Sequence, residues 1–218
     1  MPPAHAARFE DRRAAGRRLA AQLSAYADRT DVIVLGLPRG GVPVAYEVAL
    51  ALAVPLDVLL VRKLGVPGHE ELAFGAIANG GVRVLNGEVV AEAGLSRDQI
   101  EQTTAEQELE LQRRERLYRG DMPPPQLSGR TAILVDDGLA TGATMRAAVE
   151  AVHELGASAI AAVPVAPVQT CAGLAAVADD LVCLITPAQF VAVGLWYREF
   201  SPTSDEEVQE LLARAWAR

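Results

Sequence analysis

Short apolar runs that alternate with helix-like segments constrain this fold more than any other feature of the sequence. The first run, 32–35, contains only valine, isoleucine and leucine and lies between Asp31 and Gly36. Such a run is typical of a strand buried on both faces of a parallel sheet. Further strands are expected at 56–61, 131–135, 159–165 and 181–185, with helices at 43–52, 142–155 and 169–178. The alternation predicts an α/β fold in which helices flank a mostly parallel, twisted sheet.

Four segments fall outside this alternation. They are a helix at 9–27, a hairpin at 73–78 and 82–85, a charged helix at 96–119 and a final helix from about Ser204. The charged helix is either a lid over a site or, as is commoner for charged helices, a solvated or oligomer-forming helix. Glu110 and Arg114 are spaced to pair along it. We interpret 1–218 as one domain, with a core at about 30–85 and 128–186, a helical insertion at about 87–125 and a C-terminal cap at about 187–218.

The composition excludes several partners. A formal net charge of -8 argues against nonspecific nucleic-acid binding, which needs a basic surface. Five arginines near the start are interpreted as the solvated face of a helix: Arg8, Arg12, Arg13, Arg17 and Arg18. Neither a signal peptide nor a continuous membrane span is evident, so we expect a cytoplasmic protein without a membrane partner. No metal-ligand spacing is found among Cys171, Cys183, His5, His69 and His153.

The strand expected at 131–135 leads into the most specific motif of the chain. Its apolar residues run directly into Asp136 and Asp137, and a turn of small residues then leads into a helix. The N–H groups at a helix N-terminus are free to bind an anion, and Thr141 and Thr144 add hydroxyl donors. Gly142 lets the backbone approach a ligand closely. Because the two carboxylates can accept hydrogen bonds from sugar hydroxyls, the order of groups fits a ribose 5-phosphate.

Taken singly, these pieces have simpler explanations, since a threonine caps a helix and an acidic pair ends a strand. Their ordered combination resembles the motif that binds phosphoribosyl pyrophosphate (PRPP) in the type I phosphoribosyltransferases. The order and length of the other elements agree with that family, and the chain is most similar to bacterial members whose acceptor is unassigned. The resemblance implies that Asp136 and Asp137 contact the ribose hydroxyls. It also implies that the 5-phosphate is held by Ala140, Thr141, Gly142, Ala143 and Thr144.

A glycine-rich segment, 36–41, follows the first strand. By itself it is compatible with a plain turn. In the family the corresponding loop binds pyrophosphate, which implies this role for Pro38, Arg39, Gly40 and Gly41. The Arg39 guanidinium offers a fork of donors to phosphate oxygens. The family's loop often contains a cis peptide, so we predict a cis bond between Pro38 and Arg39.

Basic residues also follow the second strand, in the segment 62–71. Family members place basic residues here, beside the pyrophosphate, on a mobile loop that closes over the reaction. Arg62 and Lys63 are therefore expected to assist the leaving group, and Lys63 is the only lysine in the chain. His69 is interpreted as a loop residue without a role.

The resemblance implies that a nitrogen nucleophile displaces pyrophosphate at C1 of the ribose, with Mg²⁺ bound mainly by ligand oxygens and water. Asp136 and Asp137 would contribute to the metal indirectly, through ribose hydroxyls or water. Family members that use 6-oxopurines usually carry an acidic residue where this chain has Ala140, which counts against such an acceptor. The acceptor is expected beside Leu139, stacked on Trp196 or Tyr197; alternatively, these aromatics pack the cap or a subunit interface.

Two function classes remain open. One is an enzyme, a pentosyltransferase that uses PRPP, and the other is a non-catalytic regulator that binds PRPP. The set Arg39, Arg62 and Lys63 favours turnover, because a sensor needs less help for a leaving group. The sequence lacks the motifs of P-loop NTPases, nicotinamide enzymes and α/β hydrolases. The expected partners are PRPP, a small-molecule acceptor and further copies of the chain in a homo-oligomer.

Overall fold

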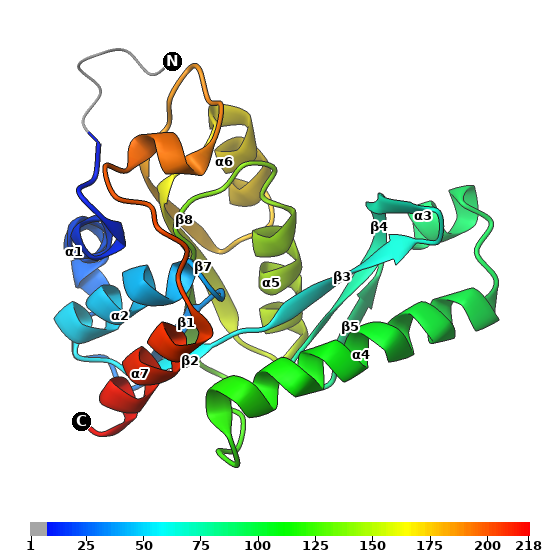
Figure 1. Ribbon diagram of the computed structural model, residues 1–218, viewed down its shortest axis with the longest axis horizontal. Helices are drawn as coiled ribbons and strands as arrows, with labels where there is room; N and C mark the ends of the chain where they lie inside the picture. Colours follow the sequence, from blue (N-terminus) through cyan, green and yellow to red (C-terminus); the bar gives the residue numbers. More distant parts are fainter. Residues whose placement is uncertain (1–7) are drawn as a thin grey trace.

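Five parallel strands form the central sheet, in the order β2-β1-β6-β7-β8 (Figure 1). The computed structural model describes residues 8–218. The strands are β1 (Val32–Gly36), β2 (Leu56–Val58), β6 (Thr131–Val135), β7 (Ser158–Val165) and β8 (Asp180–Ile185). The predicted α/β fold with a mostly parallel sheet is confirmed, and the strands lie close to the expected positions.

The sheet separates two apolar clusters, because successive side chains of a strand point to opposite faces. Val32 and Val34 belong to one cluster, whereas Ile33 and Leu35 belong to the other. The first face is covered by α1 (Arg12–Gln22), α2 (Gly41–Leu52) and α7 (Asp205–Trp216). The second face is covered by α5 (Ala143–Glu154) and α6 (Val168–Ala175) (Figure 1).

A second, antiparallel sheet in the order β3-β4-β5 projects from the core (Figure 1). Its strands are β3 (Val61–Val66), β4 (His69–Ala78) and β5 (Val82–Leu85), followed by helices α3 (Gly87–Glu92) and α4 (Arg97–Arg119). We call residues 61–119 the arm. The expected single strand at 56–61 was wrong: β2 ends at Val58, and a new strand begins at Val61 and turns away from the parallel sheet. The hairpin expected at 73–78 and 82–85 is confirmed by β4 and β5.

Helix α4 packs one face against the antiparallel sheet, and most of its other residues are exposed. Ser96 caps it with a full capping box, in which Gln99 bonds back to the Ser96 N–H. Thr104, Leu111 and Tyr118, spaced by seven residues, are buried on one face of the helix. The expected pair between Glu110 and Arg114 is present, at 2.8 Å.

The C-terminal segment crosses back over the core and ends beside α2. A 3-10 helix, η2 (Val193–Trp196), precedes Tyr197, which pairs with Phe9 in an isolated bridge. A second 3-10 turn, η1 (Ser24–Tyr26), follows α1. Among residues 8–218, no helix is both long and apolar enough to cross a lipid bilayer.

Candidate functional site at the carboxyl edge of the sheet

The acidic pair lies directly after β6, at the carboxyl edge of the parallel sheet. Asp136 Oδ1 accepts a hydrogen bond from the Asp137 N–H at 2.8 Å. Burial raises the pKa of Asp136 well above its usual range, and the neighbouring Asp137 raises it further. Burial also raises the pKa of Asp137, although Arg12 opposes the shift. A nearby cation or hydroxyl donor would therefore stabilise the ionised form of these two carboxyl groups.

The loop after β1 lies against this pair without room for a side chain. A Cβ atom on Gly40 would overlap Asp137 Oδ2, and one on Gly41 would lie 2.5 Å from the carbonyl oxygen of Val135. Only glycine permits so close an approach of the two loops. The peptide between Pro38 and Arg39 is cis, as predicted.

The small-residue turn that follows the pair opens into the N-terminus of α5. Gly142 caps the helix in the left-handed conformation, with φ of 74°, and the first N–H to bond within the helix is that of Arg146. Before Arg146, the Ala143 N–H donates to Thr141 Oγ1 at 3.4 Å, and the remaining N–H groups of the first turn give the arrangement that binds anions. Side chains of Ala140, Thr141, Ala143 and Thr144 are exposed around this turn. We call residues 140–144 the cradle.

Helix α6 contacts the cradle through Thr170. The Thr170 hydroxyl donates to the carbonyl oxygen of Ala140 at 2.7 Å. A Cβ atom on Gly142 would meet the Thr170 methyl carbon at 2.7 Å. Both the positive φ and this contact require glycine at the position.

The basic residues expected on a mobile loop lie on a strand instead. Arg62 and Lys63 belong to β3, and the chain turns only at Pro67 and Gly68. Arg62 donates twice to Gln107 Oε1, at 3.0 and 2.7 Å, so its guanidinium is directed to α4. Lys63 is exposed in a cleft of about 730 Å³ between the hairpin and α4.

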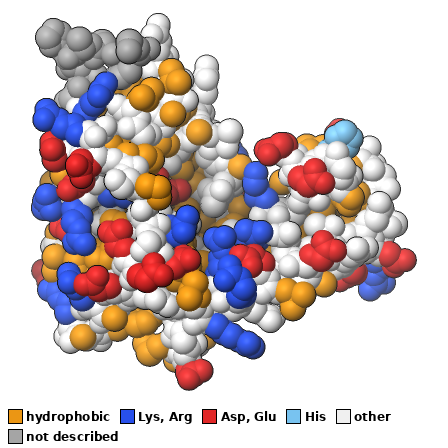
Figure 2. Space-filling model, in the orientation of Figure 1, with side chains coloured by type: hydrophobic (Ala, Val, Ile, Leu, Met, Phe, Trp, Pro, Cys, Tyr) orange, Lys and Arg blue, Asp and Glu red, His pale blue; other side chains and the backbone are white. Residues whose placement is uncertain are grey.

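This cleft joins the arm to the core. Thr144 of the cradle and Lys63 of the arm both line it, together with polar side chains of α4. Figure 2 shows lysine and arginine side chains gathered where the arm meets the core. The structure therefore brings together two predicted site residues that are far apart in the sequence.

Arg39 is half-exposed and lies in a smaller cavity of about 250 Å³. Its nearest carboxylate is Asp205 at 3.9 Å, which also accepts a 2.5 Å hydrogen bond from Tyr118. Arg113 and Arg114 of α4 line the same cavity. The predicted cation of the β1 loop is thus joined by two arginines from the arm.

Arg12 contacts the acidic pair, which the sequence did not reveal. Its Nε donates to Asp137 Oδ2 at 2.8 Å, and its Nη1 donates to the carbonyl oxygen of Ser201 at 2.7 Å. The interpretation of the N-terminal arginines as a solvated face was wrong for Arg12, whose side chain is 12% exposed. No local pattern distinguishes it from Arg17, which is 60% exposed on the same helix.

The comparisons with known proteins agree with this geometry. The family model of the phosphoribosyl transferase domain matches residues 5–196. The chain belongs to this family. Two Mycobacterium tuberculosis proteins, from strains CDC 1551 and H37Rv, carry the provisional name phosphoribosyl transferase and are each 51% identical over 208 residues. These matches cover 95% of this chain and 47% of each relative, so the chain spans about half the length of the curated relatives it matches.

A solved structure shares the whole fold. The crystal structure of the protein TT1426 from Thermus thermophilus has a TM-score of 0.87 and 42% sequence identity, and the match covers 95% of this chain and 98% of that one. The resemblance to the phosphoribosyltransferases, which rested on the motif at 132–144, is confirmed by the family match.

The side chains expected to hold an acceptor base are buried. Trp196 and Tyr197 are 4% and 3% exposed and pack with Phe9 and Val165, and the Tyr197 hydroxyl donates to the Asp137 carbonyl oxygen at 2.5 Å. Leu139 is also buried. The structure therefore supports the alternative interpretation, in which these aromatics pack the cap.

The protein itself supplies few metal ligands. Within residues 8–218, no three His, Cys, Asp or Glu side chains are grouped to hold a metal ion. His5 lies outside the described residues. Carboxylate oxygens of Asp136 and Asp137 are the oxygen donors at the site that suit Mg²⁺.

Proposed function

We propose that this chain is a phosphoribosyltransferase that transfers the 5-phosphoribosyl group of PRPP to a nitrogenous base or related amine and releases pyrophosphate. The observation that carries the proposal is the meeting of two loops at one edge of the sheet. The loop after β6 carries the acidic pair and the cradle, which leads into α5, and the glycine-rich loop follows β1. Ligands of open α/β sheets bind at this edge.

The cradle and the acidic pair account for binding of the ribose 5-phosphate. The N–H groups at the start of α5 and the hydroxyls of Thr141 and Thr144 donate to phosphate oxygens. Asp136 and Asp137 accept hydrogen bonds from ribose hydroxyls. These contacts fix C1 of the ribose without a covalent bond to the protein.

The chemical step forms a bond from the acceptor nitrogen to C1 and breaks the bond from C1 to the pyrophosphate oxygen. The electron pair of the broken bond leaves with pyrophosphate, and the acceptor nitrogen loses its proton to solvent. Negative charge therefore grows on the leaving group, where Lys63 and Arg39 can stabilise it. Arg62 acts from β3, where Gln107 orients its guanidinium.

Mg²⁺ fits this site as a companion of PRPP and not as a resident ion. The described residues offer two neighbouring carboxylates and no larger ligand cluster, so ligand oxygens and water would complete the shell. When bound, the ion neutralises charge on pyrophosphate. Asp136 and Asp137 would contact the ion through ribose hydroxyls or water.

A regulator that binds PRPP without turnover is the second candidate, and one observation favours it. Arg62 bonds to Gln107 and Arg39 lies near Asp205, so two of the three predicted leaving-group cations already have protein partners. Lys63 alone is exposed in the large cleft without an ion pair to any of the described residues.

A pyrophosphate-release assay separates the two functions. The protein is incubated with PRPP, Mg²⁺ and a panel of purines, pyrimidines and simple amines, and Lys63→Ala is compared with Arg83→Ala. Arg83 lies in the arm on β5, pairs with Glu101 and is not among the residues that line the cleft. Release with one acceptor that is lost in Lys63→Ala and kept in Arg83→Ala supports the enzyme. Binding of PRPP without release for any acceptor supports the regulator, and no binding contradicts both.

A further inference from the structure

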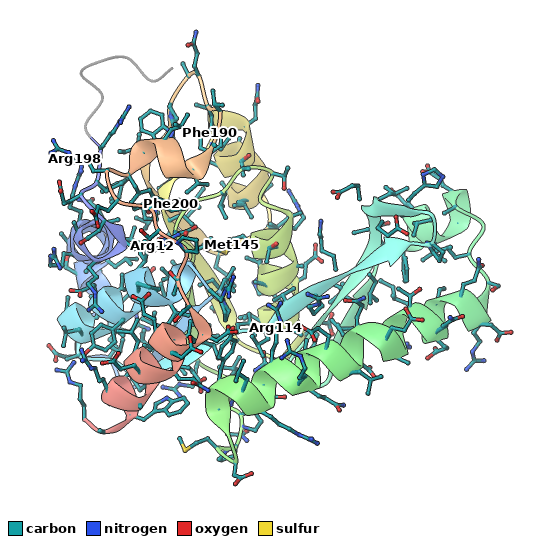
Figure 3. All side chains as sticks on the ribbon, in the orientation of Figure 1. Arg12, Arg114, Met145, Phe190, Arg198 and Phe200 are labelled. Atoms are coloured by element: carbon teal, nitrogen blue, oxygen red, sulfur yellow. The ribbon has the colours of Figure 1, made fainter. Side chains whose placement is uncertain are left out.

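The guanidinium of Arg12 reaches the acidic pair from the first turn of α1. Its two donors bond to Asp137 Oδ2 and to the carbonyl oxygen of Ser201, at 2.8 and 2.7 Å. The carbon at the centre of the guanidinium lies 3.9 Å from the centre of the Phe200 ring. Figure 3 shows Arg12 and Phe200 next to each other, between the N-terminal helix and the C-terminal segment.

These contacts use properties that only arginine combines. A planar group with several fixed donors can bond to a carboxylate and a carbonyl while its face lies on an aromatic ring. The side chains of Arg12 and Asp137 are only 12% and 14% exposed. An ion pair so shielded from water is held more firmly than a pair on the surface.

Asp137 is fixed from three directions. Arg12 holds its carboxylate, Tyr197 donates to its carbonyl oxygen, and its N–H donates to Asp136 Oδ1. No described residue donates to the other carboxylate oxygen of Asp136. The two acidic residues therefore differ: Asp137 is bonded to α1 and to the C-terminal segment, whereas Asp136 Oδ2 accepts no hydrogen bond from a described residue.

We propose that Arg12 is a positioning residue for the ribose site. It fixes the orientation of Asp137 and, through the Asp137 N–H, that of Asp136, whose unbonded oxygen receives a ribose hydroxyl. This inference rests on the proposed use of PRPP. It assigns to α1 and to the C-terminal segment a direct influence on substrate affinity, because both segments hold the Arg12 side chain.

A purely structural explanation is that Arg12 joins α1 to the segment at Ser201 and does nothing for the ligand. If Arg12 is a positioning residue, a folded Arg12 variant binds PRPP less tightly than the wild type does. If its role is purely structural, a folded variant binds PRPP with unchanged affinity. The two explanations also differ in whether the effects of Arg12 and Asp137 are coupled, since residues that act as a unit give non-additive effects.

The experiment measures PRPP binding with Mg²⁺ by calorimetry for the wild type, Arg12→Met, Arg12→Lys, Asp137→Asn and the Arg12→Met/Asp137→Asn double variant. Arg17→Gln is the control, because Arg17 lies on the same helix and, within residues 8–218, forms an ion pair only with Glu47, at 3.5 Å. Thermal unfolding of each variant checks its fold.

We expect Arg12→Met to weaken PRPP binding by about 10- to 100-fold, as for loss of a hydrogen bond to a charged group. Arg12→Lys should recover part of the loss, the double variant should bind about as weakly as the weaker single variant, and Arg17→Gln should bind as the wild type does. Wild-type affinity in a folded Arg12→Met protein, or fully additive losses, would overturn the inference alone. If Arg12→Met does not fold, Arg12→Lys with wild-type affinity overturns it, and weakened binding by folded Arg12→Lys supports it. A folded wild type that does not bind PRPP overturns the proposed function together with this inference.

Discussion

Replacing Arg119 with methionine removes the cation that neutralises a buried carboxylate beneath the arm. Arg119 ends α4, and its Nη1 bonds to Asp57 Oδ1 of β2 at 2.6 Å. The two side chains are 1% and 9% exposed, and Asp57 Oδ1 also accepts the Val58 N–H at 2.7 Å. Arg119 donates in addition to the carbonyl oxygen of Pro123. The pair therefore joins the end of the arm to the edge strand of the core.

The expected cost follows from what remains after the change. Methionine fills much of the space of the arginine stem but leaves the Asp57 carboxylate buried without a cation, bonded to the Val58 N–H. Breaking a buried pair in this way costs about 3–5 kcal/mol of unfolding free energy. For a protein of this size, that corresponds to a loss in melting temperature on the order of 10 °C.

The loss of unfolding free energy in Arg119→Met should depend on pH in a defined direction. Burial raises the pKa of Asp57, and Arg119 opposes that shift. Without Arg119 the pKa of Asp57 rises further, and an acid whose pKa is raised in the folded state stabilises the fold when it is protonated. The difference in unfolding free energy between the wild type and Arg119→Met should therefore become smaller as the pH falls from about 7 toward about 4.

Urea unfolding followed by circular dichroism measures the effect, with Arg116→Met as the control. Arg116 is exposed in the last turn of the same helix and should change stability by less than about 0.5 kcal/mol. Adding Asp57→Asn to Arg119→Met should restore part of the loss, because a buried neutral amide costs less than a buried charge. An Arg119→Met protein as stable as the Arg116→Met control at neutral pH would refute the reasoning.

Three further changes test the packing around the site. In Gly40→Ala the new Cβ atom would overlap Asp137 Oδ2, so the β1 loop must move. We expect kcat/KM or PRPP affinity to fall by about 100-fold. An unchanged value would contradict the close approach of Gly40 to Asp137. Gly142→Ala should destabilise the cradle by about 1–3 kcal/mol, because φ is 74° and the new Cβ atom would clash with the Thr170 methyl group. Adding Thr170→Ser should remove the clash but not the backbone strain, as measured by thermal unfolding. Tyr197→Phe removes the hydrogen bond to the Asp137 carbonyl oxygen and should lower the unfolding free energy by about 1 kcal/mol in urea; no loss would mean that the bond contributes nothing.

The parts of the site that the sequence predicted are contiguous in the chain. Strand β6, the acidic pair and the cradle follow one another within 131–144, so their order and residue types are visible without a structure. The segment 36–41 is contiguous as well, whereas the cis peptide between Pro38 and Arg39 was predicted from the resemblance to the family. Local chemistry sets such motifs, because backbone N–H groups, glycines and strand ends act within a few residues.

The parts that the sequence did not reveal depend on tertiary contacts or on broken patterns. Arg12 meets Asp137 across 125 residues, and nothing near Arg12 indicates that partner. A mobile loop was predicted at 62–71 from the resemblance to the family, but β3 pairs with β4 there through a register that shifts on both sides of Gly65. From the sequence, the Trp196 ring could either stack on an acceptor or pack inside the cap. Its burial in the structure decides for packing.

We propose that this edge of the sheet binds PRPP through the acidic pair. Calorimetric titration of the wild type with PRPP and Mg²⁺, beside an Asp136→Asn/Asp137→Asn double variant of confirmed fold, tests this binding without knowledge of the acceptor. We expect saturable binding by the wild type that is much weaker in the double variant. A folded wild type that does not bind PRPP, or a double variant that binds as tightly as the wild type, would contradict it.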